Sequence, residues 1–200
     1  MSSQQNAHRL RTGRYSETDR IYLLTAVTHQ RQPIFKDWRI GRLLVSQFKN
    51  AQEEGEATSL AWVVMPDHFH WLVQLHNGDL PRLMRITKSR SARAINEARH
   101  SFGTVWQKGY FDQAMRREDD MKAMARYIVA NPLRAGLVEH IGQYPLWDAS
   151  WLQERACSRK TYRQLGLSDR AASSLAIFAS KLAPTVMAYS NRGNGPRFFD

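Results

Sequence analysis

The stretch from Ala61 to Leu75, AWVVMPDHFHWLVQL, constrains the fold of this chain more than any other. It is an apolar run that is interrupted once, at Met65-Pro66-Asp67. Proline has no backbone N–H to donate to a β ladder, and it restrains the residue before it. Pro66 therefore marks a turn between two apolar runs, Leu60 to Val64 and Phe69 to Leu75, and the stretch predicts a β-hairpin.

Two histidines, one residue apart, open the second strand of this hairpin. Side chains alternate between the two faces of a strand, so His68 and His70 share one face while Phe69 and Trp71 point to the other. Two neutral imidazoles held side by side suit a divalent metal ion if a third ligand comes from elsewhere in the fold. Two half-exposed strand histidines without a ligand would give the same pattern, so the pair alone leaves both interpretations open.

Composition and charge narrow the class of partner. The chain has 200 residues, 42% of them hydrophobic and 10% aromatic, which is enough for one domain with a proper core. It carries 29 Lys and Arg against 18 Asp and Glu, a net charge of +11. Such an excess favours a polyanionic partner, most simply nucleic acid, although a basic surface without a specific partner is the alternative.

The cysteine content and hydropathy argue against a disulfide-bonded, a cysteine–zinc and a membrane-spanning protein. A single cysteine, Cys157, allows no intramolecular disulfide and no cysteine-based zinc site. The first residues contain no apolar signal core, and no later run approaches the roughly 20 apolar residues of a membrane span. We therefore expect a cytoplasmic protein with no membrane partner.

Hydrophobic periodicity predicts the remaining elements. A third helix should begin near Glu118 and must stop by Asn131, because Pro132 disfavours a helical residue before it. The other expected elements are a strand at Ile21 to Thr28, helices from about Trp38 to Glu54 and Leu80 to His100, and a short strand pair around Lys108-Gly109.

This order of elements predicts an α+β, ferredoxin-like fold, in which one antiparallel sheet is backed by two helices. The third helix is then free to cross the open face of the sheet. We expect residues 1–19 to be a flexible basic arm and residues 20–150 to be the main domain. Residues 151–200 should be a C-terminal helical extension with a flexible tail.

Three motifs in sequence identify a family. MPDHFHWLV, VWQKGYFDQAMR and ARYIVANPLRAGLV together strongly resemble the REP-associated tyrosine transposases, a branch of the HUH superfamily of single-strand DNA transposases. The opening GRYSETDRIYLLTAVTHQRQPIF is also similar to the N-terminal strand region of that family. The resemblance covers roughly residues 13–151 and does not extend to the C-terminal 50 or so residues. It implies a bacterial, nucleoid-associated protein.

The resemblance also implies a role for individual residues. The paired metal-binding histidines of the family fall on His68 and His70, which would bind Mg²⁺ or Mn²⁺, and the nucleophilic tyrosine falls on Tyr127. Asn131, one helical turn later, stands where related transposases complete the metal site. Some relatives have glutamine there, and the shorter asparagine leaves direct coordination open. Tyr110, next to Gly109, is the competing nucleophile.

The implied reaction cuts and rejoins single-stranded DNA at REP palindromic hairpins. Tyr127 would attack phosphorus to give a 5′-phosphotyrosine link and a free 3′-hydroxyl, and the retained ester energy allows the reverse step without ATP. Two other classes stay open: a non-catalytic hairpin-binding protein, and a metal-dependent nuclease that uses water. We expect the protein to be a monomer.

Charge and ring chemistry suggest which residues contact DNA. Trp106 is a candidate for base stacking, although a core position is the more usual place for such a ring. The cations on the second helix are equally compatible with a solvated face. The candidates for phosphate contacts are Arg9, Arg11, Arg14, Arg85, Lys88 and Arg93.

Overall fold

The computed structural model describes residues 16–115 and 118–149. They contain a five-stranded antiparallel sheet with strand order β4-β1-β3-β2-β5. The elements are β1 (Ile21–Val27), η1 (His29–Arg31), η2 (Ile34–Lys36), α2 (Trp38–Glu53), β2 (Ala57–Met65), β3 (His68–Leu75), α3 (Leu80–Ala98), β4 (Phe111–Ala114), α4 (Glu118–Val129), α5 (Asn131–Arg134), η3 (Ile141–Gln143) and β5 (Trp147–Ala149).

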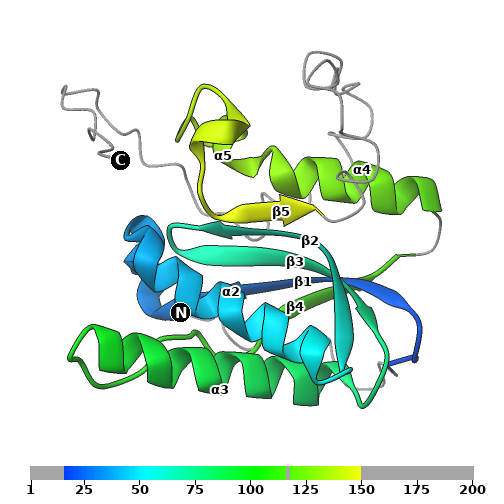
Figure 1. Cartoon of the computed structure of the whole chain (residues 1–200), viewed down its shortest axis with the longest axis horizontal. Helices are drawn as coiled ribbons and strands as arrows, with labels where there is room; N and C mark the ends of the chain where they lie inside the picture. The colour runs from blue at the N-terminus through cyan, green and yellow to red at the C-terminus, as the bar shows by residue number, and fades with distance from the viewer. Residues whose placement is uncertain (1–15, 116–117, 150–200) are drawn as a thin grey trace, which may run out of the picture. The chain divides into compact units, whose positions relative to one another are not determined.

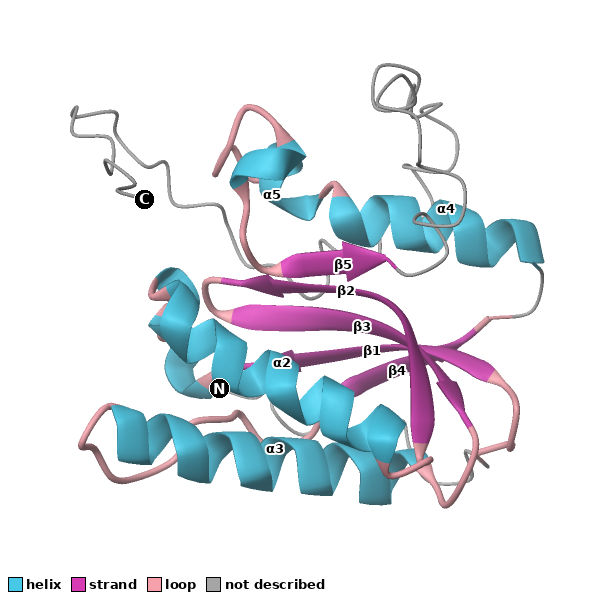
Figure 2. Cartoon of the chain, viewed as in Figure 1, coloured by secondary structure: helices cyan, strands magenta, loops and turns pink. Residues whose placement is uncertain are grey.

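The sheet separates two groups of helices. Helices α2 and α3 pack together on one face, whereas α4 packs against β2, β3 and β5 from the other side (Figure 1). The predicted α+β fold, with an antiparallel sheet and two backing helices, is confirmed, and Figure 2 shows the same layers by element type. The third predicted helix, α4, lies over the face of the sheet that α2 and α3 do not cover, as the sequence predicted.

The predicted hairpin is formed by β2 and β3, which are joined through Pro66 and Asp67. Its turn is tied to the segment after β1, because the N–H of Thr28 donates to the Asp67 carbonyl at 2.9 Å. The N–H of Phe35 donates to the Pro66 carbonyl at 3.0 Å. These bonds satisfy carbonyls that the proline turn takes out of the ladder, and they fix where β3 begins.

The main core lies between the sheet and helices α2 and α3. Phe69 and Trp71 of β3 point into it and are fully buried, and Trp71 stacks on Phe48 of α2 with ring centroids 4.4 Å apart. Buried aromatic rings of this size dominate core energetics, so truncating Phe48 to alanine should cost about 3–5 kcal/mol. This packing holds β3 from one side and turns His68 and His70 towards the other face of the sheet.

Helix α4 covers that other face of the sheet with an apolar stripe. Met124, Ala125 and Ile128 are buried, and Tyr127 beside them is 8% exposed. The helix ends at Val129, as the constraint from Pro132 requires. A new short helix, α5, then starts with the proline in its first turn, a position where the missing N–H is not needed.

Two features differ from the sequence interpretation or extend it. No strand was predicted after Asn131, but β5 pairs with β2 and adds a fifth strand. The arm was expected to reach residue 19, yet the Leu80 N–H donates to Ser16 Oγ at 3.2 Å and the Asp19 N–H to the Leu75 carbonyl at 2.6 Å. The domain therefore begins no later than Ser16. None of the helices described is long and apolar enough to cross a membrane.

Candidate functional site

The two histidines of β3 lie side by side on the α4 face of the sheet. Their ring centroids are 5.0 Å apart and the ring planes meet at 80°. His68 Nδ1 is 2.6 Å from Asp67 Oδ1, and His70 Nδ1 is 2.8 Å from Thr25 Oγ1. Neither Nε2 has a hydrogen-bond partner among the residues described. Each ring is thus oriented through Nδ1, and its Nε2 stays available as a metal ligand. Metal-binding histidines adopt this arrangement.

Asp67 is held as a carboxylate by its two neighbours. Partial burial raises its pKa, but the hydrogen bond and charge of His68, with the ion pair to Arg31, outweigh burial and lower the pKa below its usual value. Arg31 Nη1 lies 3.0 Å from Asp67 Oδ2. An ionised Asp67 keeps the His68 proton on Nδ1, so the lone pair stays on Nε2.

His70 is kept neutral. Burial is the main cause that lowers the pKa of His70 to about 3; the electrostatic effects of His68 and Arg134 act in the same direction, and that of Asp67 acts in the opposite direction. A neutral imidazole is the form that binds a metal ion. His70 is therefore ready to act as a ligand throughout the physiological pH range.

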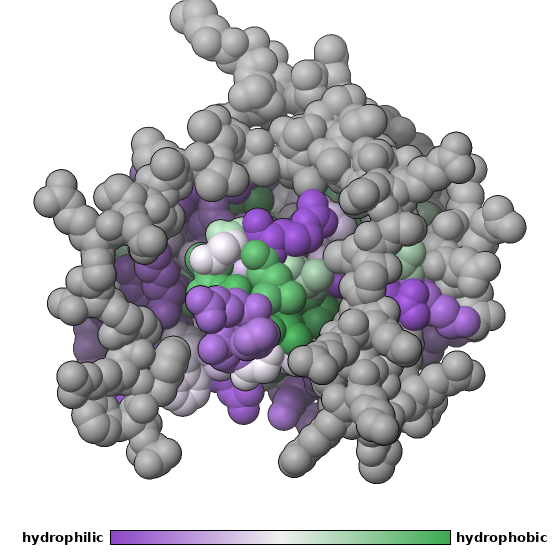
Figure 3. Space-filling view, turned by 90° about the horizontal axis from the view of Figure 1, so that it is seen from above, coloured by the Kyte–Doolittle hydropathy of each residue, from purple (hydrophilic) through white to green (hydrophobic). Residues whose placement is uncertain are grey.

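Tyr127 and Arg134 lie on the same side of the sheet as the histidines. The guanidinium carbon of Arg134 is 4.2 Å from the centroid of the Tyr127 ring, and the charge of Arg134 also acts on His70. Arg134 therefore stacks on Tyr127 and acts electrostatically on His70. Figure 3 looks down onto this side and shows apolar residues at the centre of the view bordered by hydrophilic ones. The sequence did not single out Arg134.

The competing tyrosine is on the opposite side of the sheet. Tyr110 packs, partly buried, against the core that contains Phe69 and Trp71, below the sheet. The sheet therefore stands between the Tyr110 ring and the pair His68 and His70. Of the two candidates for the nucleophile, Tyr127 is the one on the histidine face.

Asn131 begins α5, one turn after Tyr127, and it has an unusual environment. Its Nδ2 is buried with no hydrogen-bond partner, and no hydrogen bond joins it to His68 or His70. A half-turn of the amide exchanges Nδ2 for Oδ1, so a cation at this position would supply the partner that the buried group lacks. Among residues 16–115 and 118–149, no group of three or more His, Cys, Asp or Glu side chains could hold a metal ion. The candidate metal ligands are therefore the Nε2 atoms of His68 and His70 and the amide of Asn131.

Those predicted DNA-contacting residues that the structure describes are not gathered at this site. Arg9, Arg11 and Arg14 lie outside the residues described. Arg85 and Arg93 are exposed on α3, across the sheet from the histidines. Lys88 Nζ donates to the carbonyls of Gln107 and Gly109, both at 2.7 Å, and so supports a loop.

The structure places Trp106 in the core, the more usual of the two positions weighed from the sequence. Its ring is 5% exposed, it contacts Phe35 and Phe69, and its Nε1 donates to Ser91 Oγ at 3.0 Å. Stacking on a base would require this ring to leave the core. By contrast, Phe102 in the loop after α3 is fully exposed. The signal for it in the sequence, a phenylalanine between Ser101 and Gly103, was overlooked.

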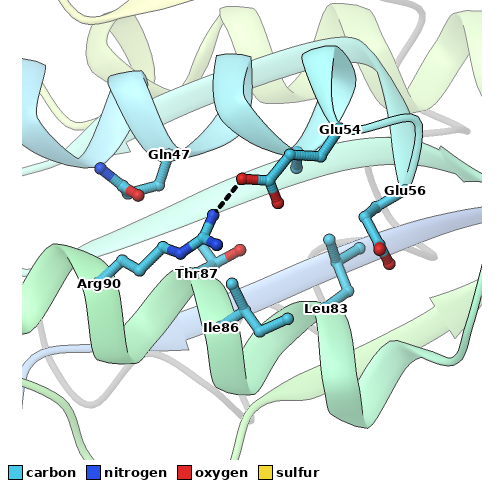
Figure 4. A pocket seen from close by; sticks show the side chains of 8 residues that line it. Gln47, Glu54, Glu56, Leu83, Ile86, Thr87 and Arg90 are labelled. Atoms are coloured by element: carbon cyan, nitrogen blue, oxygen red, sulfur yellow. Dashed lines mark hydrogen bonds and ion pairs between the residues drawn. The ribbon is translucent and has the colours of Figure 1, made fainter.

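A small pocket lies between α2 and α3, away from the histidines (Figure 4). Glu54 and Arg90 form an ion pair beside it, and the buried Thr87 Oγ1 in its wall has no hydrogen-bond partner. Its volume of about 10 Å³ is close to the room that one water molecule needs. A water here would satisfy Thr87, and the space is too small for a substrate.

Comparison with known proteins identifies the class. The family model described as "Transposase IS200 like" matches residues 17–131, more than half of the chain, and the chain belongs to this family of DNA transposases. The resemblance to REP-associated tyrosine transposases is confirmed by two relatives of that name. The Haemophilus influenzae protein is 25% identical over 136 residues, 62% of this chain and 77% of its own. The Escherichia coli K12 protein is 30% identical over 87 residues, 42% of this chain and 50% of its own.

A solved structure agrees on the fold. The structure of a REP-associated tyrosine transposase bound to a REP hairpin superimposes with a TM-score of 0.59 at 21% sequence identity. The match covers 78% of this chain and 87% of the other.

Proposed function

We propose that this protein is a single-stranded DNA endonuclease and strand-transferase, which acts at REP hairpins through a 5′-phosphotyrosine link on Tyr127. One observation carries the proposal: the helix that carries Tyr127 packs on the face of the sheet that presents His68 and His70, whereas Tyr110 packs against the core on the opposite face. The substrate class is supported by the relative whose structure holds a REP hairpin.

We assign metal binding to His68 and His70, with Asn131 as the third ligand. The two free Nε2 atoms and the unpartnered amide of Asn131 fit Mg²⁺ or Mn²⁺, as does the neutral state of His70. When bound, such a cation supplies positive charge that polarises a phosphoryl oxygen.

The covalent step exchanges one phosphate ester for another. The Tyr127 oxygen forms a bond to phosphorus and its proton passes to solvent, while the bond from phosphorus to the 3′ oxygen breaks. That oxygen takes a proton and leaves as a 3′-hydroxyl, so the DNA stays attached to Tyr127 through its 5′ phosphate. A 3′-hydroxyl of another strand then reverses the exchange and releases the tyrosine.

DNA contacts outside the site are proposed on charge and exposure. The net charge of +11 favours a phosphate backbone, and the fully exposed Phe102 is a better stacking ring than the buried Trp106. Arg9, Arg11 and Arg14 keep their proposed phosphate contacts. Arg85 and Arg93 would reach DNA that passes round the α3 side, and the bonds of Lys88 favour a structural role for it.

We also propose that the protein works as a monomer, because Tyr127 and the histidines of the same chain lie on one face. In a dimer that exchanged α4, the tyrosine would come from the partner. The localisation proposed is the bacterial cytoplasm, in association with the nucleoid, where such DNA is found.

The direct experiment is incubation with a 5′-tailed, single-stranded REP hairpin and Mn²⁺, followed by a denaturing gel. The wild type and Tyr110→Phe should both give a covalent protein–DNA adduct, and Tyr127→Phe should give none. Binding without cleavage by the wild type would favour the hairpin-binding alternative. Cleavage that persists in Tyr127→Phe without an adduct would favour hydrolysis by water.

A further inference from the structure

The position of Arg134 indicates a role other than stabilising the fold. It is the last residue of α5, three residues after Asn131, and its guanidinium carbon lies 4.2 Å from the centroid of the Tyr127 ring. Within the described part of the chain, its guanidinium has no carboxylate partner and no hydrogen bond. The other stacked arginine described, Arg39, lies over Trp38 at the start of α2, away from Tyr127.

A guanidinium without a counter-ion is a ready site for an anion. Its N–H groups lie in one plane and can donate to two oxygens of one phosphate. Stacking on an aromatic ring leaves these N–H groups free to donate. Stacking also limits the conformations of the arginine side chain, so less freedom is lost when an oxygen is bound.

The surroundings of Arg134 define which anion fits. The scissile phosphate must lie between the Tyr127 oxygen and the position that a cation held by His68 and His70 would occupy. Arg134 contacts Tyr127 directly, and its charge is felt at His70. A phosphate in that position would lie within the field of this guanidinium.

We propose that Arg134 is a catalytic residue that donates to a non-bridging oxygen of the scissile phosphate, an inference that rests on the proposed function. Charge accumulates on the non-bridging oxygens as the Tyr127 oxygen joins phosphorus and before the 3′ oxygen leaves. A fixed cation there lowers the energy of that state more than it lowers the energy of bound DNA. Arg134 stays protonated throughout and exchanges no bond.

The test compares two substrates under single-turnover conditions with Mn²⁺, using the full chain. One is the 5′-tailed REP hairpin, and the other carries a neutral methylphosphonate in place of the scissile phosphate. The variants are Arg134→Gln and Arg134→Lys, with Arg126→Gln as a matched control. Arg126 is exposed on α4, next to Tyr127 in the sequence. Thermal unfolding checks that each variant is folded.

On the phosphate substrate, Arg134→Gln should slow adduct formation by about 10²- to 10³-fold, which is the usual effect of removing one donor to a developing oxyanion. The rate for Arg134→Lys should lie between the rates of the wild type and Arg134→Gln, because an ammonium group keeps the charge but lacks the planar arrangement of N–H donors. On the methylphosphonate isomer in which the methyl group replaces the oxygen that Arg134 would contact, the wild type and Arg134→Gln should react at similar rates, because the group that Arg134 would donate to has been removed. Arg126→Gln should match the wild type on both.

Two results would overturn the role of Arg134 while leaving the proposed function intact. The first is an Arg134→Gln rate equal to that of the wild type on phosphate. The second is an equal slowing on both substrates, which a purely structural effect on Tyr127 would produce. A wild type that forms no adduct with either substrate would overturn the proposed function itself, and this inference with it.

Discussion

His70 Nδ1 and Thr25 Oγ1 lie 2.8 Å apart on neighbouring strands, where the β1–β3 ladder pairs these two residues directly. The hydroxyl therefore fixes the plane of the imidazole and leaves its Nε2 free. His68 has an equivalent anchor in Asp67, which comes from the hairpin turn. The site is thus oriented by two different parts of the sheet, and each anchor can be removed separately.

Removing the anchor of His70 should weaken metal binding without unfolding the domain. In Thr25→Val the shape of the buried side chain is kept and valine suits a strand, but the hydrogen bond is lost. We expect Mn²⁺ affinity to fall by about 10- to 100-fold, as is usual for partners of metal-binding histidines. Thr58→Val is the control, because Thr58 bonds His76 Nε2 at 2.7 Å elsewhere on the sheet. Calorimetric titration with Mn²⁺ would measure both, and equal losses would contradict the prediction.

The neutral state of His70 predicts how stability depends on pH. The pKa of His70 is lowered from 6.5 to about 3, so between these values the unfolded chain binds more protons than the folded one. The stabilisation from this residue is therefore complete above the unfolded value and declines as the pH falls towards the folded one. The slope is at most about 1.4 kcal/mol per pH unit.

His70→Gln removes this titration, so the wild type should lose stability relative to the variant as the pH falls from about 7 to about 4.5. Urea unfolding at several pH values measures the difference. Parallel stability curves for the two proteins would show that His70 does not titrate with a lowered pKa.

The exposed ring of Phe102 should contribute to DNA affinity and not to folding. Stacking of one base on an aromatic ring contributes about 1–3 kcal/mol, so Phe102→Leu should weaken hairpin binding by roughly tenfold or more. Phe102→Tyr keeps the ring and should bind as the wild type does. Fluorescence anisotropy with a labelled hairpin measures the affinities, and thermal unfolding should give the same midpoint for all three. Unchanged binding by Phe102→Leu would remove the ring from the interface.

Local patterns predicted much of the fold. A proline between two apolar runs was sufficient for the β2–β3 hairpin, and the two-residue period of a strand placed His68 and His70 on one face. The constraint from Pro132 placed the end of α4. In each case the information is contained within a few residues, so no knowledge of the tertiary structure was needed.

The missed features depend on contacts between distant segments. Strand β5 has three residues and exists because β2 offers it an edge, which no local pattern reveals. The pairing of Thr25 with His70 depends on the register of β1 against β3. The position of Arg134 over Tyr127 depends on the turn between α4 and α5.

The central claim is that Tyr127 carries the DNA. Its most direct test is to trap the adduct with a REP hairpin, trim the DNA with nuclease, digest the protein and sequence the DNA-linked peptide by mass spectrometry. We predict a nucleotide joined through its 5′ phosphate to Tyr127, in the peptide that contains Ile128 and Val129. A nucleotide on Tyr110, or on any residue of the opposite face, would contradict the account.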